Sequence, residues 1–222
     1  MTRESLYAPV TMETAPDAAK PLLQKVLGNM GFVPNLVATL AHNPLALYGY
    51  LALDGTLQKG SFTGVERQVI LLAASVENKC DYSIAAHSTS LKQLGASAEL
   101  VLQVRDGDEV SDLRLNALVS LTREMTREHG HVSKRSLDRF FGAGYKKEQV
   151  MEVILGIATK TISNYLCHIS PVALDHPFEA ERVQVLTGNN GSMNGRSIVE
   201  ESDDRSLCFE GSHAEGFKNG AD

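Results

Sequence analysis

The sequence predicts an all-α fold, a helical bundle built from antiparallel helix pairs. Apolar residues recur at helical spacing from residue 15 to about residue 168. Residues that favour helix starts precede these segments, and glycines follow many of them. No segment alternates between apolar and polar residues as a half-buried strand does. With 222 residues and a hydrophobic content of 43%, the chain is long enough to bury one sizeable core.

The first two predicted helices open at or near prolines. One begins at Ala15, with Pro16 at an early helical position where its missing N–H is tolerated, and Gly28 and Gly31 mark its end. A short second helix opens at Pro34 and runs through Leu40. The residues expected to face the core from these helices are Leu22, Leu23, Val26, Leu27, Leu36, Val37 and Leu40.

Capping residues delimit the next two helices. Asn43 is expected to cap the third helix, with Pro44 as its first residue. Thr63 and Glu66 have the spacing of a capping box, which opens a fourth helix that ends near Asn78. The apolar positions of the third helix are Leu45, Leu47, Tyr48, Tyr50, Leu51 and Leu53.

Five further helices complete the predicted bundle. The fifth starts at about Cys80 and runs to Leu94, where Gly95 terminates it. The next three start at capping serines, and the last ends before Pro171. Their expected starts are Ser97, Ser111, Ser133 and, for the last helix, Lys147, which leads to about His168. Leu113 and Ile154 are among the apolar residues expected to face inward.

Composition divides the chain into three parts. Residues 1–14 are expected to form an N-terminal arm, and residues 15–180 the helical domain. After Pro177 apolar residues become sparse, while glycine, asparagine, serine and acidic residues increase. A segment of this composition cannot bury enough apolar surface to offset its chain entropy. Residues 181–222 are therefore predicted to be a disordered tail.

Charge and cysteine content exclude several functions. The net charge is −6 and the basic residues are scattered, so nucleic-acid binding is not expected. No apolar run is long enough for a transmembrane helix, and the first residues lack a secretory signal pattern. Cys80, Cys167 and Cys208 form an odd and sparse set, which argues against a disulfide framework and favours the reducing cytoplasm.

The stretch from Cys80 to His87 carries the candidate chemistry. Cys80, Ser83 and His87 share one face of a helix, and Cys80 lies at its start, where free N–H groups favour a thiolate. A nearby imidazole can transfer protons. The structural alternative is a small buried cysteine, a helix hydroxyl and a half-exposed histidine, and spacing alone favours this alternative. A Ser83–His87 hydrolase dyad lacks an orienting acid.

Two other sets of residues have structural interpretations. Cys167 reads as a small buried apolar residue near the end of the last helix. His129 and His131 flank Gly130 at a helix end, where a cation is favoured. No third ligand stands near them in the sequence, so no metal site and no cofactor are predicted.

Four motifs carry a family resemblance that covers about residues 17–179. The stretch Cys80-Asp-Tyr-Ser83-Ile-Ala-Ala-His87-Ser88 resembles the C-x-Y-C-x-x-x-H-S signature of the alkylhydroperoxidase D and carboxymuconolactone decarboxylase superfamily. Gly31-Phe-Val-Pro-Asn-Leu resembles a segment of its peroxidase-related branch, and Glu66-Arg67-Gln68-Val69 resembles the start of the helix before the cysteines. Asn164-Tyr-Leu-Cys-His168 with Leu174-Asp175 resembles the closing segment.

The resemblance implies an all-helical homo-oligomer, a trimer or hexamer, with a thiol active site. In thiol-active members the second cysteine attacks the peroxide, the first resolves the sulfenic acid, and a glutamate and the histidine relay the proton. Here Cys80 matches the first cysteine and His87 the histidine, whereas Ser83 replaces the second cysteine and Gln68 replaces the glutamate. A serine is not oxidised as a thiolate is, and a glutamine cannot exchange the proton. Glu66 is expected to serve the capping box instead, and Glu77 is another candidate for the relay that no sequence feature places near Cys80.

Three functional hypotheses remain open from the sequence. The first is a peroxidase-related oxidoreductase in which Cys80 is the site thiol and an external thiol or Cys167 resolves it. The second is a non-redox enzyme, like the decarboxylase branch, in which His87 handles protons on a small lactone or keto acid. The third is a non-catalytic helical oligomer. The expected partners are a small-molecule substrate, a thiol reductant and further copies of the chain.

Overall fold

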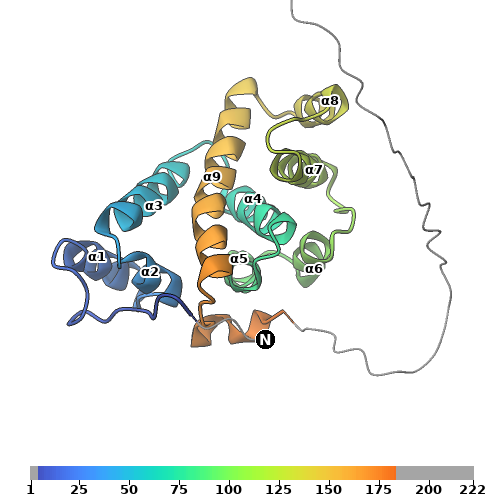
Figure 1. Cartoon of the computed structure of the whole chain (residues 1–222). Helices are drawn as coiled ribbons and strands as arrows, with labels where there is room; N and C mark the ends of the chain where they lie inside the picture. The colour runs from blue at the N-terminus through green and yellow to red at the C-terminus, as the bar shows by residue number, and fades with distance from the viewer. Residues whose placement is uncertain (1–4, 184–222) are drawn as a thin grey trace, which may run out of the picture. The chain divides into compact units, whose positions relative to one another are not determined.

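The computed structural model describes residues 5–183, which form nine α-helices and one short 3-10 helix without any strand (Figure 1). The predicted all-α class is confirmed. The helices are α1 Lys20–Met30, α2 Asn35–Leu40, α3 Pro44–Leu57, α4 Gly64–Glu77, α5 Asp81–Gln93, α6 Ala98–Asp106, α7 Leu113–Arg127, α8 Lys134–Gly142 and α9 Lys147–Ile169, followed by the 3-10 helix His176–Glu181. Most of the predicted tail, including Cys208, lies outside the described residues.

Helix α9 is the central element of the bundle. It packs against α3 on one side and against α4 on the other, and α4 in turn packs on α5 and α7 (Figure 1). One apolar cluster joins α4 to α9. A second joins α1, α2, α3, the start of α5 and the 3-10 helix, and Cys80 belongs to it. The predicted helix pairs therefore meet around α9.

Several predicted caps are present. The Asn43 side chain accepts hydrogen bonds from the N–H groups of Leu45 and Ala46, at 3.0 and 3.2 Å. Thr63 and Glu66 form the complete capping box. Ser97 and Ser133 also cap their helices through their side chains. Short-range side-chain chemistry was therefore sufficient to locate these helix starts.

Two predicted helix starts were wrong. α1 begins at Lys20 rather than Ala15, and Pro21 takes the early helical position that was expected for Pro16. The Thr11 N–H donates to Thr14 Oγ1 at 2.8 Å, which holds the preceding residues in a turn.

α7 begins at Leu113 with Asp112 as its cap, not at Ser111. The Ser111 N–H donates instead to Gln103 Oε1 at 3.1 Å, so this serine is tied to α6.

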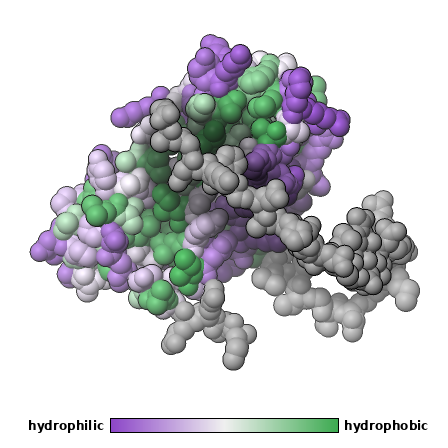
Figure 2. Space-filling view, turned by 45° about the horizontal axis from the view of Figure 1, so that its top comes forward, coloured by the Kyte–Doolittle hydropathy of each residue, from purple (hydrophilic) through white to green (hydrophobic). Residues whose placement is uncertain are grey.

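Some apolar residues of the predicted helices are exposed. They are Leu27, Leu45, Tyr48, Leu113 and Ile154, with exposed fractions of 40, 81, 62, 82 and 46%. Figure 2 shows apolar residues exposed in the middle of the face that it presents. α3 carries apolar residues all around its axis, so hydrophobic pattern alone does not identify its buried side.

The buried face of α9 is largely polar. Thr159, Lys160, Ser163 and Asn164 are each at most 1% exposed. One turn before Lys160, Gly156 lies so close to α4 that an added Cβ would be 2.7 Å from Ile70 Cγ2. The glycine therefore permits the close packing that brings the polar face of α9 against α4.

Candidate active site

The α4–α5 turn places Cys80 at the start of a helix. Lys79 adopts a left-handed conformation, with φ at 56°, and the Cys80 N–H then donates to Ser75 O at 3.0 Å. Cys80 is the N-cap residue of α5, and its side chain makes no capping hydrogen bond. The side chain is only 2% exposed. Its sulfur therefore lies beside the positive end of a helix, in a site largely closed to water.

Cys167 reaches the same point from the end of α9. It packs against the apolar cluster that contains Cys80, the two thiols affect each other's protonation, and neither cysteine is in a disulfide. The neighbouring residues contact each other as well, because His168 Nε2 lies 3.4 Å from Lys79 O. The interpretation of Cys167 as merely a small apolar residue was therefore incomplete, since it is half of a thiol pair.

Lys160 is the buried cation of the site, and the sequence analysis missed it. It lies seven residues before Cys167 on α9, a spacing that places both side chains on one face of the helix. Burial lowers the pKa of Lys160 to about 8, while the negative charges of Cys80, Cys167 and Asp54 act in the opposite direction. No contiguous sequence motif contains this lysine, and its only signal is a lysine on an otherwise buried helix face.

The two thiols differ in their protonation. The hydrogen bond from Cys167 is the largest effect that lowers the pKa of Cys80, to about 6, against the opposing effect of burial. The Ser83 hydroxyl and N–H and the charge of Lys160 lower it further. The pKa of Cys167 is raised, because its proton is held by the Cys80 sulfur and because it is buried. At neutral pH the pair is therefore a Cys80 thiolate and a Cys167 thiol.

Ser83 is positioned to support the thiolate. Its Oγ is buried and has no hydrogen-bond partner among residues 5–183. The hydroxyl lies one helical turn after Cys80, and it lowers the pKa of that thiol. Asn164 is similar, because its buried Nδ2 also lacks a partner within the described part of the chain. It lies between Lys160 and Cys167 on the same face of α9.

Gln68 and His87 form the second half of the site. His87 Nδ1 lies 2.8 Å from Gln68 Oε1, so the amide oxygen accepts from the Nδ1–H and leaves Nε2 as the basic nitrogen. Burial lowers the pKa of His87 well below its usual value, and the charge of Lys160 acts in the same direction. The imidazole is therefore neutral at pH 7. Lys160 is close enough to affect both His87 and Cys80.

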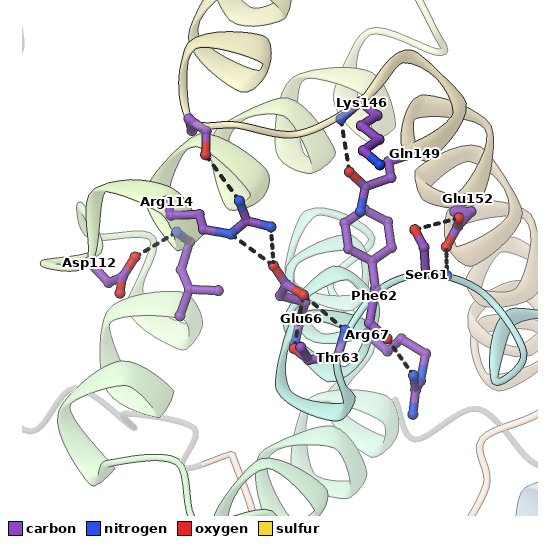
Figure 3. Close-up of polar contacts among 12 residues, drawn as sticks. Ser61, Phe62, Thr63, Glu66, Arg67, Asp112, Arg114, Lys146, Gln149 and Glu152 are labelled. Atoms are coloured by element: carbon purple, nitrogen blue, oxygen red, sulfur yellow. Dashed lines mark hydrogen bonds and ion pairs between the residues drawn. The ribbon is translucent and has the colours of Figure 1, made fainter.

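The nearby glutamates serve other contacts. Figure 3 shows that Glu66 points towards Thr63 and Arg114. Its carboxylate accepts from the Thr63 N–H at 2.9 Å and pairs with Arg114 at 3.1 Å. Glu77 lies 3.7 Å from Arg127. The expectation that Glu66 completes the capping box is thus confirmed, and neither carboxylate takes the position of Gln68.

A solvent-open pocket of about 170 Å³ adjoins the buried groups. It lies between α3 and α4, and its wall includes Asp54, Arg67, Gln68 and Leu71. Gln68 in this wall contacts His87, and Asp54 interacts with Lys160. Gln68 therefore connects the wall of this pocket to the buried His87.

Metal and membrane sites have no support within residues 5–183. No group of three or more His, Cys, Asp or Glu residues lies close enough to hold a metal ion in this range. None of the helices described is sufficiently long and apolar to cross a membrane. His129 has a left-handed backbone, with φ at 53°, and lies just beyond the end of α7. This position agrees with the helix-end interpretation of His129.

Comparison with known proteins supports the family resemblance. Residues 44–124 match the sequence profile of the Carboxymuconolactone decarboxylase family. This range contains Gln68, Cys80, Ser83 and His87, but it does not contain Lys160 or Cys167. No curated protein sequence matches the chain.

Solved structures show the same fold. The alkylhydroperoxidase AhpD core of an uncharacterized peroxidase-related protein from Ralstonia eutropha JMP134 is 22% identical, with a TM-score of 0.70, and the match covers 80% of this chain and 96% of that one. A peroxidase-related protein from Silicibacter sp. TM1040 is 18% identical, with a TM-score of 0.69 and coverage of 82% and 98%. The debrominase Bmp8, in complex with 2,3,4-tribromopyrrole, is 16% identical, with a TM-score of 0.69 and coverage of 82% and 97%.

Proposed function

We propose that this chain, which has the alkylhydroperoxidase D fold and matches the Carboxymuconolactone decarboxylase family over residues 44–124, is a thiol-dependent oxidoreductase that reduces small hydroperoxides. The observation that carries the proposal is a fully buried Lys160 whose charge acts on Cys80 and Cys167, two thiols that pack in one apolar cluster. A purely structural cysteine gains nothing from a buried ammonium group, and burying that ammonium is costly. A reactive thiolate gains electrostatic stabilisation from it.

The first chemical step uses the Cys80 thiolate as a nucleophile. Its sulfur attacks the terminal oxygen of the hydroperoxide, a sulfur–oxygen bond forms, and the oxygen–oxygen bond breaks. The sulfur is oxidised by two electrons to a sulfenic acid, and the peroxide is reduced to an alkoxide that becomes an alcohol on taking a proton. Lys160, with a pKa lowered to about 8, holds a proton beside the sulfur for this transfer.

The remaining groups can orient the peroxide. The unpartnered Nδ2 of Asn164 is a donor for a peroxide oxygen, and the free Nε2 of His87 is an acceptor for the peroxide hydrogen. Gln68 holds His87 in the required tautomer but cannot take its proton. This arrangement differs from a carboxylate relay, because the mobile proton is placed on Lys160.

The test is peroxide titration of the full-length protein with Cys208 replaced by serine. We expect peroxide-dependent labelling of Cys80 by dimedone, a sulfenic-acid reagent, when Cys167 is replaced by serine and the oxidised protein is unfolded in the presence of the reagent, which opens the buried site. Cys80→Ser should abolish this labelling, and Lys147→Met, at the exposed start of α9, is the matched lysine control for Lys160→Met. Absence of any oxidation at Cys80 under excess peroxide would refute the proposal.

A second candidate function is favoured by one observation. The neutral His87, with Nδ1 fixed by Gln68 and Nε2 free, has the arrangement of a general base. Such a base suits proton transfer on a small lactone or keto acid. If Cys80→Ala keeps turnover of such a substrate while His87→Ala abolishes it, the non-redox function is the correct one. If neither substitution changes any reaction, the chain is a non-catalytic helical protein.

We also propose that the functional unit is a homo-oligomer. Large apolar side chains are exposed on α3 and α9: Leu45, Tyr48, Met151, Ile154, Tyr165 and Ile169. Large apolar side chains that are exposed together on neighbouring helices are typical of surfaces covered by a partner. Sedimentation analysis should give a multiple of the monomer mass, and Leu45→Lys with Ile154→Lys should reduce it.

A further inference from the structure

We propose that Cys167 is the resolving thiol of this site, and that it closes a disulfide between the start of α5 and the end of α9. The proposal rests on the proposed function for the peroxide reaction that forms the sulfenic acid on Cys80. The ability of Cys80 and Cys167 to form a disulfide does not depend on that reaction. The proposal also gives the chain a two-thiol cycle although Ser83 stands where the family motif has a second cysteine.

The contacts at the site bring the two sulfurs together from distant parts of the sequence. Cys80 belongs to an apolar cluster against which Cys167 packs, and the two thiols interact electrostatically. The contact between His168 Nε2 and Lys79 O, at 3.4 Å, independently brings the adjacent residues of the two helices together. The two cysteines therefore lie in neighbouring parts of one packed cluster, as closing a disulfide bond of about 2.05 Å requires.

The resolving step is balanced within the pair. The Cys167 sulfur attacks the sulfur of the Cys80 sulfenic acid, and a sulfur–sulfur bond forms as the sulfur–oxygen bond breaks. The departing hydroxide takes the proton that leaves Cys167, and one water molecule is produced. The positive charge of Lys160 acts on both sulfurs, so it also favours the Cys167 thiolate that develops during the attack.

Burial favours an internal partner over an external thiol. Cys80 is 2% exposed, so a bulky thiol reaches its sulfenic acid only if the helices separate. Cys167 is only partly buried. A dithiol reductant can therefore attack the Cys167 sulfur of the disulfide, which supplies two electrons and releases Cys80 as the leaving group.

Attack of the reductant on Cys167, with Cys80 as the leaving group, agrees with the relative stability of the two thiolates. The group that leaves a disulfide fastest is the thiol that is the better-stabilised thiolate. Cys80 has that stabilisation from Cys167, Ser83 and Lys160. Reduction through the more exposed sulfur therefore returns the active thiolate directly.

The test uses the full-length chain with Cys208→Ser, so that Cys80 and Cys167 are its two thiols. One sample is treated with diamide, which oxidises thiol pairs directly, and another with hydrogen peroxide. After the free thiols are blocked, both are digested without reductant and the peptides are identified by mass. We expect a peptide linked through Cys80 and Cys167 in both samples, and loss of two hydrogens from the intact protein.

The outcomes separate this proposal from the proposed function. If peroxide produces a sulfenic acid on Cys80 but neither oxidant produces the linked peptide, the resolving role is overturned and the peroxide reaction stands. If diamide produces the linked peptide but peroxide oxidises nothing, the thiol pair is supported and the peroxidase proposal fails. Cys167→Ser must abolish the linked peptide, and it should increase dimedone labelling of Cys80 several-fold if Cys167 is the resolving thiol.

Discussion

Replacing Cys167 by alanine should raise the pKa of Cys80. The hydrogen bond from the Cys167 thiol is the largest of the effects that lower this pKa, and alanine removes the donor without adding a charge. Cys167→Ser is the matched variant, because a hydroxyl at the same place can still donate to the thiolate. The two substitutions remove the same sulfur but only one of them removes the hydrogen bond.

The size of the effect follows from the free energies involved. The pKa of Cys80 is lowered from 9.0 to about 6, which at about 1.36 kcal/mol per pH unit corresponds to roughly 4 kcal/mol in favour of the thiolate. A hydrogen bond to a charged group contributes about 1.5–3 kcal/mol of this. Its loss should therefore raise the pKa of Cys80 by about one to two. At pH 7 the thiolate fraction should fall from about nine tenths to between about one half and one tenth.

The assay is the ultraviolet absorbance of the thiolate followed against pH, with Cys208→Ser in every sample. This measurement requires no reagent to reach the buried sulfur. We expect the wild-type thiols to show a transition near pH 6, the Cys167→Ala variant one at clearly higher pH, and Cys167→Ser one close to the wild type. If alanine and serine give the same curve as cysteine, the hydrogen bond does not control the thiolate and the reasoning fails.

Three further predictions concern stability. Lys160→Met should stabilise the protein at pH 7 by about 1–3 kcal/mol, because the folded chain lowers the pKa of this lysine. Glu66→Ala should destabilise it by about 2–3 kcal/mol, because both the reciprocal bond to Thr63 and the ion pair with Arg114 are lost. Gly156→Ala should cost about 1–3 kcal/mol, because the new methyl group would lie 2.7 Å from Ile70. Urea unfolding measures all three.

Each stability prediction has a discriminating control. The penalty from Lys160 is complete below its folded pKa of about 8 and disappears as pH rises to its unfolded value. The advantage of the methionine variant should therefore shrink towards pH 10, and a constant difference would contradict the assignment. Glu99→Ala, on the exposed start of α6, should change stability much less than Glu66→Ala. Gly55→Ala, with nothing within 4 Å of its new methyl group, should stabilise α3.

The sequence was sufficient where structure depends on neighbouring residues. Asn43, Thr63 and Glu66 act within one helical turn, so their capping roles could be predicted before any tertiary contact was known. The buried side of α3 could not, because apolar residues surround it and packing selects among them. The cap of α7 was assigned to Ser111 for a related reason. Ser111 is hydrogen-bonded to Gln103 of α6, and the next residue, Asp112, caps α7 instead.

Some residues of the candidate site could likewise be predicted from the sequence, and others could not. Gln68, Cys80, Ser83 and His87 lie in two helices that are adjacent in sequence, and a motif comparison could select them. Lys160 and Cys167 come from α9, and their role exists only because α9 packs between α3 and α4. On an isolated helix a lysine is expected to face water, but here Gly156 lets the helix approach α4 so closely that Lys160 becomes 1% exposed. The buried charge of Lys160 belongs to no sequence motif, so it can be identified only from the fold. The same charge stabilises the thiolate form of Cys80.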